Sequence, residues 1–420
     1  MSKAKAVVIC GGGVIGLCCA YYLARVGHRV TLIDRGAEDR DHCALGSAGY
    51  VSPSQILPLA APGLPGLALK GMFNPRSPFY LPPRLDSELL RWSWLFWRAC
   101  RRRHVARSAP VLRDLCTASH RLFEEFDDIA GGVCEFERRG RLELCKTREE
   151  LARQEARLAR VASALGVEAR VLDAGEVAAL EPGVRLDVAG GVYFPGDCHL
   201  TPARFTAALT QLLAEMGVRL QWNTTVYGWH ADGGRLAAVR TTAGDIVADE
   251  FVLAAGAWSP SLAGELDLGL PLQAGKGYSL TLPQPRFRPR IPMIFTEARI
   301  AVTPLNGSLR FGGTLDLSGV NTVVRPERVR QIIESVPRYF PDFRAEDFAE
   351  ARPWCGLRPV SPDGLPYIGR FRRYRNLIAA SGHAMLGVTL APITGKLVAE
   401  VVDGRQPSVA LSPLSPDRYA

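Results

Sequence analysis

AVVICGGGVIGLCCAYYLARVGHRVTLID, residues 6–34, decides the fold of the first part of this 420-residue chain. A short apolar run that reads as a buried strand leads directly into G-x-G-x-x-G. A segment of helical periodicity, a glycine and a second apolar run ending in an acid follow. The unit spans about 30 residues, the length of a dinucleotide-binding βαβ unit. Three consecutive glycines also argue against one continuous membrane-spanning helix here.

Each part of this unit has a physical task in binding a nucleotide. Gly11 permits a tight turn, Gly13 lets the backbone approach a pyrophosphate, and Gly16 lets helix and strand pack closely. The helix N-terminus offers free N–H groups and partial positive charge to phosphates. Asp34 can accept both hydroxyl protons of an adenosine ribose. The alternative is a glycine turn without a ligand, and the motif alone does not separate FAD from NAD.

The chain contains no second G-x-G-x-x-G, because Gly275-Lys276-Gly277 lacks a third glycine and a following helix. Flavoproteins that NAD(P)H reduces often carry a second nucleotide motif. If FAD occupies the first site, its electrons are therefore expected from a small molecule.

Composition narrows the class of protein further. An apolar content of 47% is typical of a globular chain with a sizeable core. The net charge of +9 suits acidic partners, but the basic residues are scattered apart from Arg101-Arg102-Arg103, which argues against nucleic-acid binding. The ten cysteines form no C-x-x-C pair and no zinc-like group, so we expect reduced thiols, no metal and a cytoplasmic protein.

Six pieces of the chain, in order, carry a resemblance to a known family. They are GGGVIGLCCAYYLARVGHRVTLIDR, SAGYVSP, LAAPGLP, KGYSLTLP, GLRPVSPDGLPYIG and SGHAMLGVTLAPITGKL. With them the chain resembles FAD-dependent D-amino-acid dehydrogenases, within the wider group of D-amino-acid, glycine and sarcosine oxidases. The resemblance covers nearly the whole chain. It implies bound FAD and oxidation of a small amino acid to an imino acid. Electrons then pass to a quinone-linked acceptor or, in the oxidases, to oxygen.

The expected fold class is α/β plus α+β, with two domains built from interleaved segments. A Rossmann-like FAD-binding domain uses both chain ends, and an antiparallel-sheet substrate domain roofs the flavin. The FAD-binding domain is expected over residues 1–85, 147–265 and 355–420, and the substrate domain over residues 86–146 and 266–354. The main helices are expected over residues 85–126, 147–165, 201–216, 325–338 and 386–402.

One stretch departs from the family's D-alanine-type members. Residues 190–202, GGVYFPGDCHLTP, look closer to the glycine- and proline-oxidising members. The segment LAPITG also resembles those members more closely. This favours a cyclic amine such as D-proline or hydroxy-D-proline as substrate. The alternatives are an oxygen-using oxidase, a non-catalytic FAD-binding subunit of a complex, and an NAD-dependent Rossmann enzyme.

Three residues are candidates for the chemistry. Arg358 stands alone in the Gly/Pro-rich stretch 355–369, and its fork can hold a substrate carboxylate with two parallel hydrogen bonds. The resemblance places it in the same role, and a structural salt bridge is the alternative. Tyr278 could donate to the same carboxylate or be a core tyrosine with a backbone partner. His383 could contact the flavin or the substrate, or be a satisfied loop histidine.

The resemblance also implies the contacts of FAD. Residues 47–49 would lie at the isoalloxazine edge, and Val226 at the adenine. A helix beginning near Leu386 would point N–H groups at flavin N1/O2 and stabilise the reduced, anionic ring. The full expected set is Gly11, Gly13, Val14, Ile15, Gly16, Asp34, Arg35, Ser47, Ala48, Gly49, Val226, Ala255, Gly256, Gly382, His383, Leu386, Gly387, Val388 and Thr389.

Residues 89–103, LLRWSWLFWRACRRR, join four large aromatics to a basic tail. One interpretation is a helix lying on an acidic membrane surface, peripheral to the inner face of the cytoplasmic membrane, where a quinone would be met. The other is a core helix that buries Leu90, Trp94 and Trp97, which have helical spacing. Aromatic stripes at helical spacing are mostly core, so the core helix is favoured.

Overall fold

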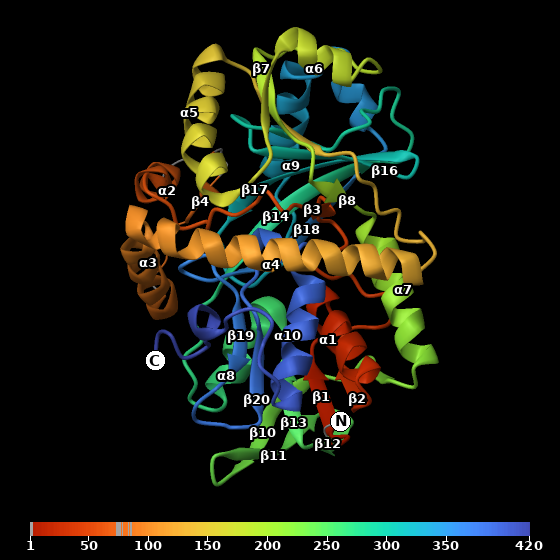
Figure 1. The fold of residues 1–420 in the computed structure, drawn as a ribbon, viewed down its shortest axis with the longest axis vertical. Helices are drawn as coiled ribbons and strands as arrows, with labels where there is room; N and C mark the ends of the chain where they lie inside the picture. Colours follow the sequence, from red (N-terminus) through yellow and green to blue (C-terminus); the bar gives the residue numbers. More distant parts are fainter. Residues whose placement is uncertain (1–2, 73–76, 78, 83, 85) are drawn as a thin grey trace.

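Two sheets, one above the other in Figure 1, form the framework of the molecule. The computed structural model describes residues 3–72, 77, 79–82, 84 and 86–420. In this part of the chain, one sheet has six strands and the other nine. The long helix α4 (Arg102–Ile129) crosses the front of the molecule between them.

The six-stranded sheet is the nucleotide-binding type of sheet that the N-terminal motif predicts. Its order is β19-β20-β13-β1-β2-β9, and all neighbours are parallel except β19 and β20. The strands are β1 (Ala6–Cys10), β2 (Arg29–Ile33), β9 (Arg219–Gln221), β13 (Glu250–Leu253), β19 (Tyr367–Arg370) and β20 (Leu377–Ser381). β1 is apolar throughout because layers cover both faces of the sheet.

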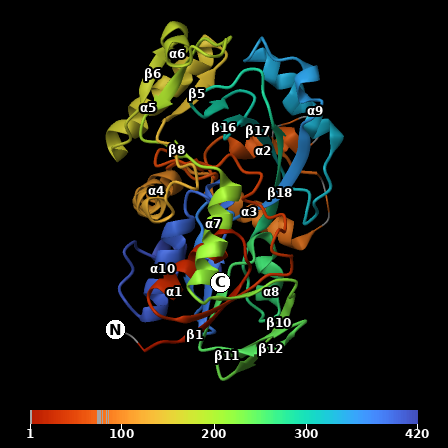
Figure 2. The same ribbon diagram turned by 90° about the vertical axis from the view of Figure 1, so that its right-hand side faces the viewer.

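Figure 2 shows α1 (Val14–Arg25) and α10 (Ala391–Asp403) on one side of this sheet, and the hairpin sheet with α8 (Ser259–Gly264) on the other. The hairpin sheet joins β10 (Val226–Asp232), β11 (Arg235–Thr241) and β12 (Gly244–Val247), and α7 (Pro202–Glu215) packs beside α1.

The two ends of the chain are joined in this domain. α1 and α10 pack so closely that a methyl group at Gly395 would overlap the carbonyl oxygen of Cys18. The Nζ of Lys5 donates to the carbonyl oxygen of Val402 at 2.6 Å and to Glu250 at 3.0 Å. The prediction of one nucleotide domain assembled from both chain ends therefore describes this arrangement.

The nine-stranded sheet is mainly antiparallel and lies above the first. Its order is β18-β14-β17-β16-β15-β5-β7-β6, with β4 beside β17. The strands are β4 (Phe79–Tyr80), β5 (Arg141–Cys145), β6 (Arg170–Asp173), β7 (Gly190–Phe194), β14 (Gln273–Leu282), β15 (Met293–Phe295), β16 (Ile300–Leu305), β17 (Ser308–Asp316) and β18 (Arg352–Val360). Its outer face packs on α9 (Pro326–Ser335), and its inner face looks toward the nucleotide-binding sheet.

Three predicted domain boundaries need correction. β6 and β7 lie in the nine-stranded sheet, although residues 147–265 are assigned above to the FAD-binding domain. β18 pairs with β14 and belongs to the same sheet. α4 packs on α10 and shares the core of the nucleotide-binding domain. In each case the partner is distant in sequence, so local patterns do not show the pairing.

The remaining elements connect the two sheets. They are β3 (Tyr50–Val51), which pairs with β8 (Cys198–His199), α2 (Leu64–Met72), α5 (Arg148–Leu165), α6 (Ala174–Leu180) and five 3-10 turns among the described residues, at 256–258, 336–338, 345–348, 384–386 and 412–414. None of the helices formed by the described residues combines the length and apolar content that crossing a membrane needs.

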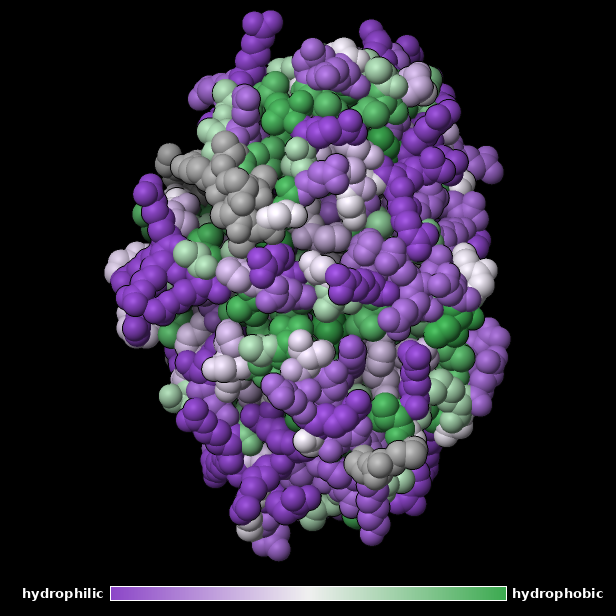
Figure 3. Space-filling view, in the orientation of Figure 1, coloured by the Kyte–Doolittle hydropathy of each residue, from purple (hydrophilic) through white to green (hydrophobic). Residues whose placement is uncertain are grey.

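The predicted helix over residues 85–126 is two helices, α3 (Ser87–Ala99) and α4. α3 buries Leu89, Trp92 and Phe96. Its opposite side exposes the three residues expected in the core, with exposed fractions of 62% for Leu90, 53% for Trp94 and 58% for Trp97. The core interpretation is therefore wrong about which face is buried. In Figure 3 the left edge, where Figure 1 places α3, carries strongly hydrophilic side chains beside pale ones.

Candidate functional site

The glycine loop after β1 has the shape that a pyrophosphate needs. Gly11 has φ +117°, and a methyl group there would overlap the carbonyl oxygen of Ala254. A methyl group at Gly16 would overlap the carbonyl oxygen of Gly11, so helix and loop touch. At Gly13 it would meet no atom within 4 Å. The open space therefore lies in front of Gly13, at the start of α1, where helix N–H groups attract phosphate.

Asp34 is held at the end of β2, beside this loop. Its carboxylate accepts from the backbone N–H of Gly12 at 2.7 Å and of Gly36 at 2.8 Å. Arg40 forms an ion pair with it at 3.3 Å and lies 4.1 Å above the ring of Trp222. The carboxylate is thus fixed at the end of β2, where the sequence predicts a ribose-binding acid. Arg40 and Trp222 were not predicted, because nothing in their spacing distinguishes them from surface residues.

The other adenosine-end candidates lie around the same loop. Arg35 stacks over Trp258 at 3.9 Å. Ala255 and Gly256 follow β13, and Ala255 lies against Gly11. Val226 begins β10 on the neighbouring hairpin sheet. The structure therefore brings together the N-terminal loop and the predicted residues that follow β13.

Residues 47–49, which are expected at the isoalloxazine edge, lie in the segment 45–50, which is held by the nine-stranded sheet. Arg310 Nη1 donates to the carbonyl oxygens of Leu45 at 2.6 Å and Ser47 at 2.8 Å. The hydroxyl of Thr303 donates to the carbonyl oxygen of Ala48 at 2.8 Å. Burial lowers the pKa of Arg310 to about 10, and no carboxylate among the described residues forms an ion pair with it. Arg310 was not predicted, since an arginine in a strand is usually solvated.

The C-terminal segment supplies a turn rather than the predicted helix start. α10 begins at Ala391, and a 3-10 turn covers residues 384–386. The hydroxyl of Thr389 donates to the carbonyl oxygen of Tyr50 at 2.8 Å, so this turn lies beside the segment 45–50. Val388 and Thr389 are buried residues, and within the described chain their backbone N–H groups have no protein acceptor. Buried N–H groups rarely remain unpaired, so these two fit a ligand such as the oxygen-rich edge of a flavin.

Arg358 lies on the inner face of β18. Its guanidinium covers Gly277 of β14, where any side chain would overlap it, and Nη1 donates to the carbonyl oxygen of Thr314 at 2.9 Å. No carboxylate in the described part of the chain lies within ion-pair distance. Burial lowers the pKa of Arg358, and Cys43 and Asp316 only partly offset this. The result is a buried cation without a counter-ion, which is costly unless a ligand supplies one.

The backbone under this guanidinium is strained. Thr314 has φ +65°, a left-handed conformation that is unfavourable for a β-branched residue. Its carbonyl oxygen accepts from Arg358, while its own hydroxyl is buried and has no hydrogen-bond partner among the described residues. Such strain persists where the surroundings impose it, and it is concentrated at functional sites.

Tyr278 needs correction. It neighbours Gly277 on β14, so its side chain points to the opposite face of the sheet. There its hydroxyl donates to Asp316 at 3.3 Å, inside the outer core. Burial and Asp316 raise the pKa of Tyr278. The structure therefore does not bring this hydroxyl to Arg358, and the tyrosine is a core residue with a carboxylate partner.

His383 is buried between the two sheets. Its Nε2 lies 2.9 Å from the hydroxyl of Thr394, which itself donates to the carbonyl oxygen of Leu390. Nε2 therefore carries the proton, and Nδ1 is an acceptor with no partner among the described residues. Burial lowers the pKa of His383 to about 3, so the ring is neutral.

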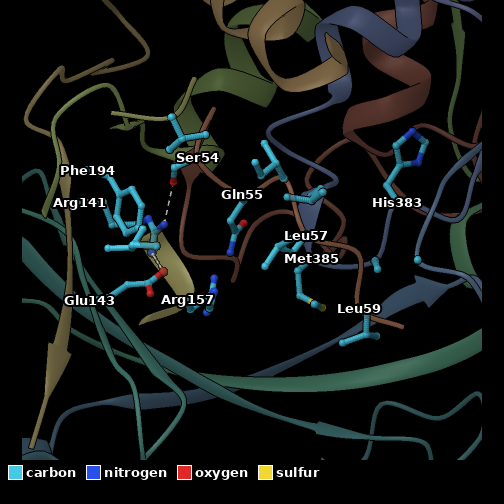
Figure 4. A pocket seen from close by; sticks show the side chains of 16 residues that line it. Ser54, Gln55, Leu57, Leu59, Arg141, Glu143, Arg157, Phe194, His383 and Met385 are labelled. Carbon is cyan, nitrogen blue, oxygen red and sulfur yellow. Dashed lines mark hydrogen bonds and ion pairs between the residues drawn. The ribbon is translucent and has the colours of Figure 1, made fainter. Parts of the chain in front are cut away.

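A cavity of about 140 Å³ opens beside His383 (Figure 4). Leu57, Leu59 and Met385 form its apolar end near the histidine. Arg141 and Glu143 lie at the other end, where Arg141 donates to Glu143 at 2.8 Å. The residues Asp197 and Ser54 complete this buried network at 2.7 and 2.9 Å from Arg141. Arg358 does not line the cavity; the two are connected through the backbone bridge between Val360 and His383.

The network at the charged end was not predicted. Burial alone would lower the pKa of Arg141, but Asp197 and Glu143 outweigh it and raise the pKa. Arg141 thus faces two carboxylates, and Arg157, which also lines this end of the cavity, is a second guanidinium with no ion pair among the described residues. The only signal was an arginine inside the otherwise buried strand RLELC.

Comparison with known proteins agrees with this geometry. The sequence profile of a family described as FAD dependent oxidoreductase matches residues 6–401. A D-amino acid dehydrogenase of Granulibacter bethesdensis is 35% identical over 419 residues, 99% of this chain and 99% of that relative. One of Rhizorhabdus wittichii is also 35% identical, over 98% of this chain and 100% of that relative.

Solved structures share the fold over the whole chain. Glycine oxidase from Geobacillus kaustophilus superposes with a TM-score of 0.80 at 24% identity, covering 100% of both chains. L-proline dehydrogenase from P. horikoshii superposes with a TM-score of 0.75 at 18% identity, covering 100% of this chain and 98% of that one. With the glycine loop, the fixed Asp34 and the profile match taken together, the chain belongs to the family of FAD dependent oxidoreductases.

Proposed function

We propose that the protein oxidises a D-amino acid, or a cyclic amino acid of the D-proline or hydroxy-D-proline type, to the imino acid. Arg358 carries the proposal, because it is a buried guanidinium with no carboxylate partner in the described chain. A substrate that brings its own carboxylate supplies the missing counter-ion. The two relatives at 35% identity are named D-amino acid dehydrogenases, which supports the D configuration.

The residues around Gly13, Asp34, Ser47 and Thr389 would hold FAD. When bound, FAD accepts the two electrons and the hydrogen that leave Cα as a hydride. The substrate nitrogen must first lose a proton to solvent, so that its lone pair can form the C=N bond. The amino acid thereby becomes an imino acid, and an acceptor of the quinone type would finally take up the two electrons.

The protein's own contribution is position and charge. Thr314 occupies one N–H of Arg358 and orients the fork, while Gly277, having no side chain, leaves the room that the guanidinium occupies. A carboxylate held in this way cannot rotate, which fixes the direction of the Cα–H bond. His383, with Nδ1 unprotonated, can accept an N–H of the cofactor or substrate but cannot repel a cationic amine.

The cavity beside His383 supports a small aliphatic or cyclic substrate. Its near wall is formed by Leu57, Leu59, Met385 and Leu386, which offer no partner for a charged side chain. At its far wall Arg141 is paired with Asp197 and Glu143, while Arg157 forms no ion pair among the described residues. A charged side chain of a substrate would be left unpaired if it lay against this apolar near wall.

The test is anaerobic bleaching of the flavin by D- and L-proline, hydroxy-D-proline, D-alanine, glycine and sarcosine. We expect a D or cyclic amino acid to bleach it fastest, and a quinone or dye to reoxidise it faster than oxygen does. Rapid oxygen uptake would instead identify a glycine- or sarcosine-type oxidase, which the likeness to glycine oxidase makes the second candidate. Bound flavin that no amino acid bleaches would contradict the proposal and indicate a non-catalytic subunit.

A further inference from the structure

The exposed side of α3 is a surface that the proposed chemistry does not use. Leu90, Trp94 and Trp97 follow one another at i, i+4 and i+7 and each is more than half exposed. Single exposed apolar residues are normal, but three large ones on one helical face form a patch that marks an interaction site. We call Leu90, Trp94 and Trp97, with Arg91 and Arg98 beside them, the α3 face.

The charge around the α3 face has one sign. Residues 89–113 contain seven arginines and no lysine, aspartate or glutamate. In the described chain, no carboxylate pairs with Arg98, with residues 101–103 or with Arg107. Arg98 lies 4.5 Å above the ring of Trp94, and Arg101 lies 5.9 Å from the ring of Trp97. Each exposed indole therefore has a guanidinium beside it, free to bind an anion.

We propose that the α3 face docks on an anionic lipid bilayer. Tryptophan prefers the boundary between headgroups and acyl chains, because its ring is apolar and its N–H is polar. The arginines would bind lipid phosphates while their stems cover the apolar surface. A second copy of this chain is a poor occupant, since it would bring seven arginines against seven.

The docked surface is directly connected to the proposed site. On its buried side, Trp92 Nε1 donates to the carbonyl oxygen of Val360 at 2.9 Å. Val360 bridges to His383 and lies two residues after Arg358 on β18. A bilayer under α3 would therefore place a lipid-dissolved acceptor next to the reacting side of the molecule. This last step rests on the proposed function, whereas docking itself does not.

The test is cosedimentation of the full-length protein with vesicles of phosphatidylcholine alone or mixed with phosphatidylglycerol. We expect binding to the mixed vesicles that falls as salt is added. The double variant Trp94→Ala/Trp97→Ala should lower the partition coefficient by roughly tenfold or more. Arg102→Gln/Arg103→Gln should lower it by about fivefold for each charge, from about 1 kcal/mol per arginine near an anionic surface.

Matched controls alter exposed residues elsewhere. Tyr227→Ala/Val247→Ala removes two exposed apolar side chains from the hairpin sheet, and Arg330→Gln/Arg338→Gln removes two exposed charges near α9. Both should bind vesicles like the parent. Flavin content and the rate of flavin bleaching report whether each variant is folded.

Three results would overturn docking: no binding of the parent to mixed vesicles, equal binding of Trp94→Ala/Trp97→Ala, or a dimer in sedimentation velocity that this variant abolishes. If no amino acid bleaches the flavin, the proposed function alone is contradicted. The predicted binding to vesicles does not depend on that result.

Discussion

Two guanidinium groups lie on opposite faces of the same three strands, β14, β17 and β18. On the outer face, Arg328 donates to Asp316 at 3.2 Å, and Tyr278 donates to the same carboxylate at 3.3 Å. On the inner face, the carbonyl oxygen of Thr314 is the one hydrogen-bond partner of Arg358 among the described residues. One face is electrostatically complete, whereas the other leaves a cation without an anion.

The difference distinguishes a residue that stabilises the sheet, Arg328, from a residue that is proposed to bind a ligand, Arg358. A buried pair such as Arg328 and Asp316 is strongly destabilised when one partner is lost, because the other remains charged and desolvated. An unpaired buried cation lowers stability until an anion arrives. Substitutions on the two faces should therefore affect different measurements.

The largest expected effect is on the outer face. Arg328→Ala should lower the free energy of unfolding by about 3–5 kcal/mol, because Asp316 is left buried without a counter-charge. Denaturant unfolding of the flavin-loaded protein measures this. The matched control Arg330→Ala, an exposed arginine on the same helix, should change little. Equal stability of the two variants would remove the distinction between the faces.

The second effect is on the inner face and appears in kinetics. Arg358→Ala should lower kcat/KM by about a hundredfold to a thousandfold, since truncating one partner of a buried charged pair costs about 3–4 kcal/mol. Its free energy of unfolding should stay within about 1 kcal/mol of the parent. Arg358→Lys keeps the charge but loses the fork and should recover only part of kcat/KM. A normal kcat/KM in Arg358→Ala would show that the carboxylate binds elsewhere.

The third prediction concerns His383, at the edge of the inner face, and the pH dependence of the free energy of unfolding. Burial lowers the pKa of His383 to about 3, whereas an unfolded histidine titrates near about 6.5. Between these values the unfolded chain binds more protons, so the free energy of unfolding falls as pH falls, by up to about 1.4 kcal/mol per pH unit.

His383→Asn should remove about 2 kcal/mol of the loss between pH 7 and pH 5. Paired unfolding curves at the two pH values measure it, with the exposed His230→Asn as control. An unchanged pH slope in His383→Asn would mean that the ring is not buried as a neutral group.

The smallest effect tests the assignment of Tyr278 to the outer face. Tyr278→Phe should lower the free energy of unfolding by about 1 kcal/mol, through loss of its bond to Asp316. It should leave KM for the amino acid unchanged. A clear rise in KM with normal stability would instead place the hydroxyl beside Arg358 and break the comparison.

Features that local chemistry determines could be predicted from the sequence. The glycine loop needs Gly11, Gly13 and Gly16 at one spacing, and the structure has a turn, an opening and a close contact at those positions. The long helices and the hairpin turning at 232–234 also follow from local patterns. Arg358 could be singled out because its neighbours are almost all uncharged.

Features that depend on partners distant in sequence could not be predicted. β14 is buried on both faces, so its sequence does not show which face holds the proposed site and which face, that of Tyr278, meets the outer core. In α3 the sets Leu89, Trp92, Phe96 and Leu90, Trp94, Trp97 both have helical spacing. A helix that is apolar nearly all round does not reveal by periodicity which side meets the core.

The joining of the two chain ends has a consequence for biosynthesis. β20 pairs with β13, and α10 packs on α1, yet β20 and α10 come from residues 377–403, which are made long after β1 and α1. Until they leave the ribosome, the nascent chain holds an unpaired edge of β13 and an uncovered apolar helix, surfaces that invite aggregation. The domain that carries the glycine loop therefore completes its fold last, although its first strand is made first.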